Sequence, residues 1–72
     1  MNVESIGASA GLVWKALDEA VVLGVKQLRT ITKLKEKEVY AAIGWLAREG
    51  KVTLQPSDTD AKEIIVTLIQ DK

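Results

Sequence analysis

The chain has 72 residues, of which 47% are hydrophobic and 28% charged, and its ten basic and ten acidic side chains give a formal net charge of zero. A chain of this length forms one domain at most and buries only about 60% of the surface that it exposes when unfolded. The absence of cysteine excludes disulfides and thiolate chemistry, and the absence of histidine excludes Ser-His-Asp catalysis and the commonest metal ligand. We therefore expect a single domain over residues 1–72, with no metal and no cofactor.

Two features of the sequence bear on location. The longest uncharged run, residues 6–14, is about half the length of a membrane span. Residues 2–4 supply no cationic leader of the kind that begins a signal peptide. We expect a soluble, cytoplasmic protein that has no membrane partner.

The first expected element is an amphipathic helix over residues 4–20. Trp14 lies beside its apolar stripe and is expected in the core, and Gly7 and Gly11 are expected to allow close helix packing. The next stretch, residues 21–25, is β-branched and predicts a connector or a very short strand. The apolar stripe of the helix consists of Ile6, Ala10, Val13 and Leu17.

Two further helices are predicted, over residues 25–32 and 36–49, with Leu34 buried in the tight turn between them. Gly50 follows the second of these helices, as is common at helix ends. The apolar stripe of the shorter helix is Val25, Leu28 and Ile31, and that of the longer one is Val39, Ala42, Ile43 and Leu46.

After Gly50 the apolar period changes from about 3.6 to 2, which indicates strands. A turn-forming cluster at residues 56–60 separates this first strand from a β-branched strand over residues 64–69. The two strands predict a hairpin that covers the open face of the helices. Its core-facing residues are expected to be Val52, Leu54, Ile64, Val66 and Leu68.

This order of elements is that of a winged helix-turn-helix, a mainly α fold of the α+β class with three helices and a C-terminal two-stranded wing. Residues 6–14 and 42–51, which include the run Gly-Trp-Leu-Ala-Arg-Glu, also resemble a family of short, free-standing winged helix-turn-helix proteins of uncharacterised function. The chain departs from that family at Gly24 and Lys35, where a capping side chain usually starts the second and third helices. The resemblance implies an architecture and brings no established ligand.

Basic residues concentrate in residues 26–51, where seven Lys and Arg against three Glu give a net charge of +4. This polarity favours contact with phosphates, although a solvated turn would show the same pattern. The helix over residues 36–49 has no Asn or Gln with which to read bases, and Asp58 and Asp60 give the wing tip the wrong charge. The candidate DNA-binding residues are Lys33, Lys35, Lys37, Tyr40, Arg48 and Lys62.

Apolar residues outside the expected core faces predict an interface, in which Trp45 is the anchor unless it folds back as peripheral core. The dimer-interface candidates are Leu12, Ala41, Gly44, Trp45, Ile65 and Ile69. We expect a DNA-binding winged helix protein, a small transcriptional regulator that acts as a homodimer and binds double-stranded DNA weakly and with strong salt dependence. The alternative is a protein-interaction module without DNA binding, and neither hypothesis involves an enzyme or a small-molecule ligand.

Overall fold

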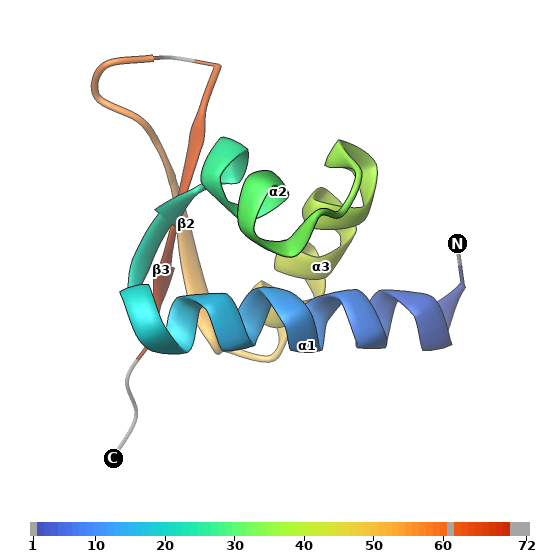
Figure 1. Cartoon of the computed structure of the whole chain (residues 1–72). Coiled ribbons are helices and arrows are strands. Elements are labelled where there is room, and N and C mark those ends of the chain that lie inside the picture. The colour runs from blue at the N-terminus through green and yellow to red at the C-terminus, as the bar shows by residue number, and fades with distance from the viewer. Residues whose placement is uncertain (1, 61, 70–72) are drawn as a thin grey trace.

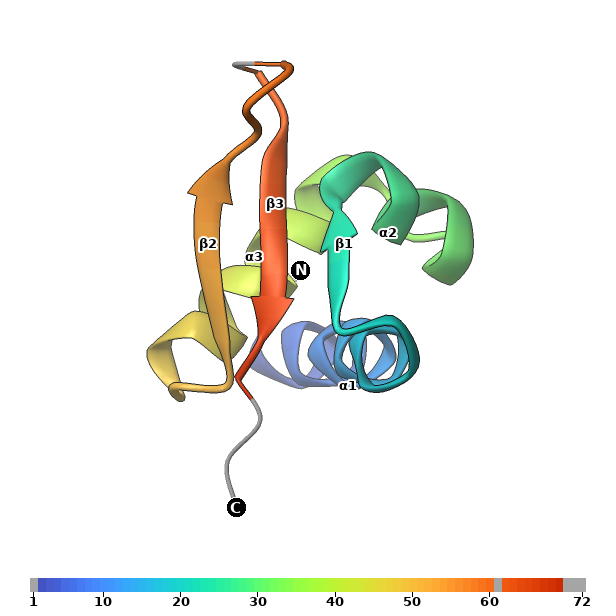
Figure 2. The same cartoon turned by 90° about the vertical axis from the view of Figure 1, so that its left-hand side faces the viewer.

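Three helices pack on one face of a three-stranded antiparallel sheet in the computed structural model, which describes residues 2–60 and 62–69 (Figure 1). Figure 2 views the molecule from the sheet side, with the helices behind the strands. The elements in chain order are α1 (Val3–Ala20), β1 (Val22–Gly24), α2 (Val25–Thr32), α3 (Glu36–Arg48), β2 (Val52–Pro56) and β3 (Ile64–Leu68). The predicted winged helix-turn-helix fold is confirmed.

Local hydrogen bonds explain where α1 begins and ends. The side chain of Asn2 accepts the Ser5 backbone N–H at 2.8 Å, and Ser5 Oγ accepts the Asn2 N–H at 2.9 Å, so the two residues form a capping box. At the other end Val21 has a φ of 71°, an uncommon conformation for a β-branched residue, and its N–H donates to the Leu17 carbonyl at 2.6 Å. This turn directs the chain from α1 into β1.

The segment that the sequence left open as connector or short strand is a strand. β1 pairs antiparallel with β3, with Leu23 opposite Val66, and the strand order is β1-β3-β2. The predicted two-stranded wing is therefore part of a three-stranded sheet. A strand of three residues is too short to show an alternating pattern, and it forms because β3 offers it a pairing edge.

The core follows the predicted stripes of α1 and α3 closely. Ile6 is only half-buried, and Leu34 packs on the core from the turn after α2. The buried apolar residues are Ala10, Val13, Leu17, Leu23, Val25, Leu28, Val39, Ala42, Ile43, Leu46, Val52, Val66 and Leu68.

Two residues predicted in the core lie at the surface instead. Ile31 is 55% exposed, because α2 has only eight residues and its last turn lies over a hollow that Leu12 of α1 also lines. Leu54 is 42% exposed, because it lies on the edge strand β2 and borders an open groove.

The two tryptophans exchange their predicted environments. Trp14 was expected in the core and is 39% exposed, whereas Trp45 is half-buried and packs on the core, as its alternative assignment proposed. Both line a hollow between α1 and α3 to which Gly7 and Gly11 contribute. A Cβ atom built at either glycine meets no neighbour within 4 Å, so the prediction that these glycines allow close packing is wrong within the chain.

Candidate nucleic-acid interface

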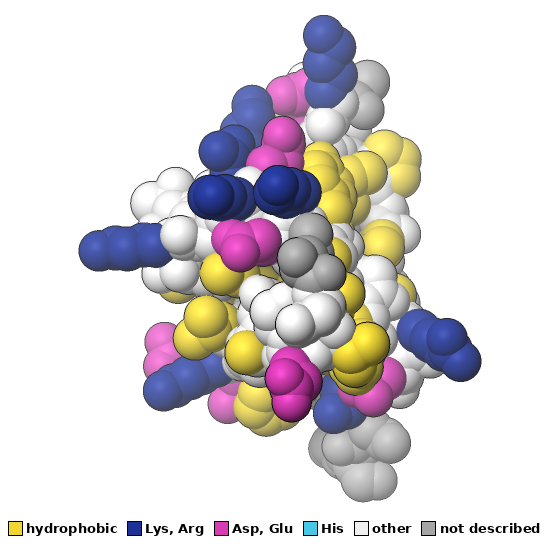
Figure 3. Space-filling model, turned by 90° about the vertical axis from the view of Figure 1, so that its right-hand side faces the viewer, with side chains coloured by type: hydrophobic (Ala, Val, Ile, Leu, Met, Phe, Trp, Pro, Cys, Tyr) yellow, Lys and Arg dark blue, Asp and Glu magenta, His cyan; other side chains and the backbone are white. Residues whose placement is uncertain are grey.

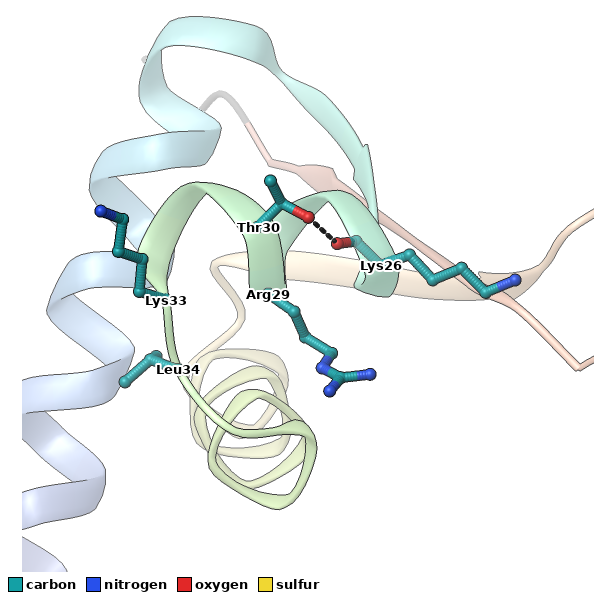
Figure 4. A pocket seen from close by; sticks show the side chains of 5 residues that line it. All are labelled: Lys26, Arg29, Thr30, Lys33 and Leu34. Atoms are coloured by element: carbon teal, nitrogen blue, oxygen red, sulfur yellow. Dashed lines mark hydrogen bonds between the residues drawn. The ribbon is translucent and has the colours of Figure 1, made fainter.

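The strongest concentration of positive charge lies on α2. Lys26, Arg29 and Lys33 follow one another at helical spacing and are all exposed. Together with Thr30 and Leu34 they line an open hollow of about 360 Å³ (Figure 4). Lys26 and Lys33 point in opposite directions, so the cations are spread along the surface rather than gathered around one point. Such an arrangement suits successive phosphates of a nucleic-acid backbone better than a single enclosed anion.

The turn between α2 and α3 extends this basic surface. Lys33 ends α2 in a left-handed conformation with φ 62°, and its N–H donates to the Arg29 carbonyl at 2.8 Å. Lys35 starts α3, and its N–H donates to Glu38 Oε1 at 2.8 Å. Lys37 follows in the first turn of α3 and is exposed. Lys and Arg side chains accordingly gather on the upper half of the face in Figure 3, interspersed with acidic groups.

The wing is tied to the start of α2 by two acidic side chains. Asp60 Oδ2 lies 3.4 Å from Lys26 Nζ, and Glu63 Oε2 accepts the Lys26 backbone N–H at 3.3 Å. The backbone N–H of Lys62, followed by the Lys26 ammonium, holds the pKa of Asp60 below its ordinary value. The wing acids therefore interact with α2 within the chain, and Asp60 does not simply face outward as the sequence suggested.

Glu63 also supplies what the sequence lacks at the start of α2. Gly24 is the N-cap and has no side chain, although its N–H donates to Gln27 Oε1 at 2.9 Å. The Glu63 carboxylate, 37 positions away from Lys26, takes the place of the missing capping group. A Cβ atom on Gly24 would lie 2.7 Å from Glu63 Oε2, so the glycine makes room for this carboxylate.

The remaining DNA-binding candidates are not all brought together. Arg48 lies at the opposite end of α3 from Lys37, near α1, whereas α3 begins on the side of the molecule where the wing tip lies (Figure 1). Tyr40 lines a groove between α3 and β2, and Lys62 is exposed in the wing turn. The sequence reasoning did not select Lys26 and Arg29, although their helical spacing with Lys33 was a usable signal.

The dimer-interface candidates are distributed over separate surfaces. Leu12 lines the hollow between α1 and α2, and Trp45 the hollow between α1 and α3. Ile65 is half-buried beside Gly24, and Ile69 is 41% exposed after the end of β3. Ala41 is half-buried on α3, and Gly44 lies in the groove between α3 and β2.

That groove is lined mainly by apolar surface and has a volume of about 340 Å³. Tyr40 and Leu54 remain 40% and 42% exposed at its sides. Figure 3 shows hydrophobic side chains in a band along its right-hand edge, on the side of the molecule where β2 lies. The groove is lined by Tyr40, Ile43, Gly44, Leu54, Gln55, Pro56 and Ile64.

Within residues 2–60 and 62–69, no helix is both long and apolar enough to cross a membrane. The same described residues contain no group of three or more acidic side chains placed to hold a metal ion.

Comparisons with known proteins identify the family. The sequence model of the winged helix-turn-helix domain family DUF2582 matches residues 1–68. The solution NMR structure of protein BT2368 from Bacteroides thetaiotaomicron has a TM-score of 0.80 and 34% sequence identity, over 94% of this chain and 79% of that one. No curated protein matches the chain in sequence.

Two more distant structures share the fold. BpsR of Bordetella bronchiseptica, whose DNA binding is regulated by 6-hydroxynicotinic acid, has a TM-score of 0.79 at 18% identity, over 99% of this chain and 54% of that one. The C80S mutant of MarR from E. coli, solved with operator DNA, has a TM-score of 0.75 at 14% identity, over 97% and 46%. This chain thus spans about half the length of either, and the likeness shows the fold alone. From the family match, the chain belongs to the DUF2582 family of winged helix-turn-helix domains.

Proposed function

We propose that the protein is a small homodimeric regulator that binds duplex DNA through the cations of α2 and the α2–α3 turn. The observation that carries the proposal is the run of exposed cations Lys26, Arg29 and Lys33 along α2 and its C-terminal end, continued by Lys35 and Lys37. Lysine and arginine gain affinity for DNA by releasing condensed counterions. The fold is shared with a MarR protein that was solved on operator DNA, which supports the same partner here.

The binding is proposed to be independent of base sequence. The exposed residues in the first half of α3 are Glu36, Lys37 and Tyr40, and neither Asn nor Gln occurs anywhere in the helix. Bidentate recognition of adenine needs one of those amides, and the single arginine of α3, Arg48, is its last residue. The contacts therefore go to phosphates, which position a protein without distinguishing bases.

The salt dependence of DNA binding provides a quantitative test of this proposal. If three to five cations of one chain reach phosphates, the logarithm of the affinity falls with the logarithm of salt at a slope of about −3 to −4.5. Fluorescence anisotropy with a random duplex at several salt concentrations measures the slope. Replacing both Lys35 and Lys37 with alanine is expected to reduce its magnitude by about two units.

A matched pair of arginine variants tests the location. Arg29→Ala removes a cation from the proposed surface and is expected to flatten the slope by about one unit, whereas Arg48→Ala, at the far end of α3, leaves it unchanged. Absence of binding at low salt, or equal effects of the two variants, contradicts the proposal.

One observation favours a second function, protein association without DNA binding. The groove between α3 and β2 is apolar, and its flanking residues Tyr40 and Leu54 are each about two-fifths exposed. Exposed apolar surface of this kind marks protein interaction sites. If association is the main function, variants at Leu54 impair it while Arg29→Ala has no effect on any measured binding.

A further inference from the structure

We infer that the free edge of β2 is the surface on which a second copy of the chain docks, so that two β2 strands pair antiparallel across a two-fold axis. The two three-stranded sheets then form one continuous sheet of six strands. This inference rests on the homodimer in the proposed function and adds the surface and its register. Among the described residues, no other strand pairs with the outer side of β2 (Figure 2).

The hydrogen bonds of β2 show which backbone groups remain available. The Lys51 carbonyl accepts the Ile69 N–H at 2.8 Å, and the Ser57 N–H donates to the Glu63 carbonyl at 2.9 Å. In an antiparallel ladder, alternate residues bond to the same neighbour, so residues 51, 53, 55 and 57 point their polar groups toward β3. The N–H and C=O groups of Val52 and Leu54 and the C=O of Pro56 consequently point away from the sheet.

This edge carries one of the features by which proteins prevent pairing, Pro56, but lacks another, a charged side chain within the strand. Lysine is the commonest guard of an exposed strand, and β2 (Val52–Pro56) contains no charged residue. Pro56 has no N–H to offer, yet its carbonyl remains an acceptor. The edge therefore presents two donors and three acceptors in one row.

A two-fold axis at Leu54 satisfies every donor of the edge. The Leu54 N–H donates to the Leu54 carbonyl of the second copy, and the Val52 N–H donates to its Pro56 carbonyl. Symmetry doubles these two bonds to four. No bond in this register requires the missing N–H of Pro56.

The side chains favour the same arrangement. Val52 is buried on the helix side of the sheet, and side chains alternate along a strand, so Leu54 and Pro56 lie on that same side and border the groove. Pairing at Leu54 brings the two Leu54 side chains together across the axis. Each is 42% exposed in the single chain, and each then closes the open side of a groove next to Tyr40.

Charge complementarity selects a second copy as the occupant. In this register Lys51 lies opposite Ser57 of the second copy, one position from its Asp58, so opposite charges come within one residue of each other at both ends of the paired strands. Lys51 and Asp58 are both exposed. The contact of Lys51 within the chain, with Glu49 at 3.8 Å, is long and exposed and competes weakly.

The docked copy does not cover the cations of α2. The strand order places β2 at one edge of the sheet, and α2 lies on the side of β1, the other edge (Figure 2). Dimerisation and DNA binding therefore use separate surfaces, and variants of one are expected to leave the other intact.

Sedimentation equilibrium of the full chain tests the surface. Leu54→Glu is expected to convert the dimer into a monomer, because it places two like charges at the axis. Leu12→Glu, at a residue that is 49% exposed on α1, is the matched control and is expected to remain dimeric. Circular dichroism checks that both variants are folded.

A charge exchange tests the register independently of Leu54. Lys51→Asp and Asp58→Lys are each expected to raise the dimer Kd roughly fivefold, because symmetry applies each change twice to a surface pair. The double variant is expected to restore the wild-type Kd. Hydrogen exchange of the Val52 and Leu54 amides, which point away from the sheet, is expected to slow as protein concentration rises.

The possible outcomes distinguish an error in the proposed β2 surface from an error in the proposed homodimer. A Leu54→Glu variant that remains dimeric, or Val52 and Leu54 amides that exchange equally fast at all concentrations, overturns the β2 surface while the homodimer stands. A wild-type chain that sediments as a monomer at high concentration overturns both. A double charge variant that is no tighter than either single variant refutes the register.

Discussion

Replacing Glu63 with alanine tests whether the wing holds the start of α2. Gly24 provides no capping side chain, and the Glu63 carboxylate accepts the Lys26 N–H at 3.3 Å, which is at the long end of the hydrogen-bond range. Loss of an N-cap costs about 0.5–2 kcal/mol, and we expect about 1 kcal/mol here. Since the urea m-value of so small a domain is about 1 kcal/mol per molar, the unfolding midpoint should fall by about 1 M.

Variants at the same position and at Gly24 identify the cause. Glu63→Gln retains an accepting oxygen and loses the charge that favours a helix N-terminus, so it is expected to lie between wild type and Glu63→Ala. Gly24→Ser offers a hydroxyl from the N-cap itself. When Glu63 is present, the Cβ of the new serine would lie 2.7 Å from Glu63 Oε2, so the two groups compete for space. In the Glu63→Ala background that space is free.

The double-mutant cycle tests whether Gly24 and Glu63 are energetically coupled. Gly24→Ser is expected to recover about 0.5–1 kcal/mol in the Glu63→Ala background and to have little or no benefit in the wild type. If the serine changes the unfolding free energy equally in both backgrounds, the two positions are not coupled and the wing does not cap α2. A Glu63→Ala midpoint within about 0.3 M of wild type would refute the same reasoning.

Two further variants test local features of the fold. Gly11→Ala is expected to raise the free energy of unfolding by about 0.5–1 kcal/mol, because a Cβ there meets no atom within 4 Å; a lower thermal midpoint would show that the glycine is needed for packing. The pKa of Asp60 lies below its ordinary 3.8, chiefly because of the Lys62 N–H and then Lys26. Ionised Asp60 therefore stabilises the fold above about pH 4, and this contribution is lost as the pH falls through the lowered pKa. Asp60→Asn is therefore expected to make acid unfolding shallower below about pH 4 by circular dichroism, and unchanged curves would show that its contacts have no effect on stability.

The helices were predictable because their period and their burial coincide. Val13 and Leu17 on α1 and Val39 on α3 are fully buried, as the apolar stripes indicated. A very short strand at β1 was one of two predicted alternatives, but its place in the sheet was not predictable, because the pairing depends on β3, more than 40 positions later. The local spacing of apolar residues thus predicts the helices, which bury one full face, whereas a short strand such as β1 depends on its pairing partner.

The candidate site was less predictable, because its contacts join distant segments. Trp45 lies one position before the buried Leu46, about 100° around α3, so the sequence placed it on the outward face, with peripheral core as the alternative. Gly7 and Gly11 leave space on α1, which the half-buried indole of Trp45 borders. The link from Glu63 to Lys26 spans 37 positions and has no local signal at all.

The acidic residues of the wing explain how a chain of zero net charge can present a basic surface. Asp60 forms an exposed ion pair with Lys26 at 3.4 Å, and Glu63 accepts a hydrogen bond at the start of α2. Asp58, in the proposed dimer, meets Lys51 of the second copy. None of these three acids then opposes Arg29 or Lys33, whose charges remain available to phosphates within a screening length of about 10 Å at 0.1 M salt. The acidic wing is therefore compatible with DNA binding, because its carboxylates interact with the start of α2 and, in the proposed dimer, with the second copy.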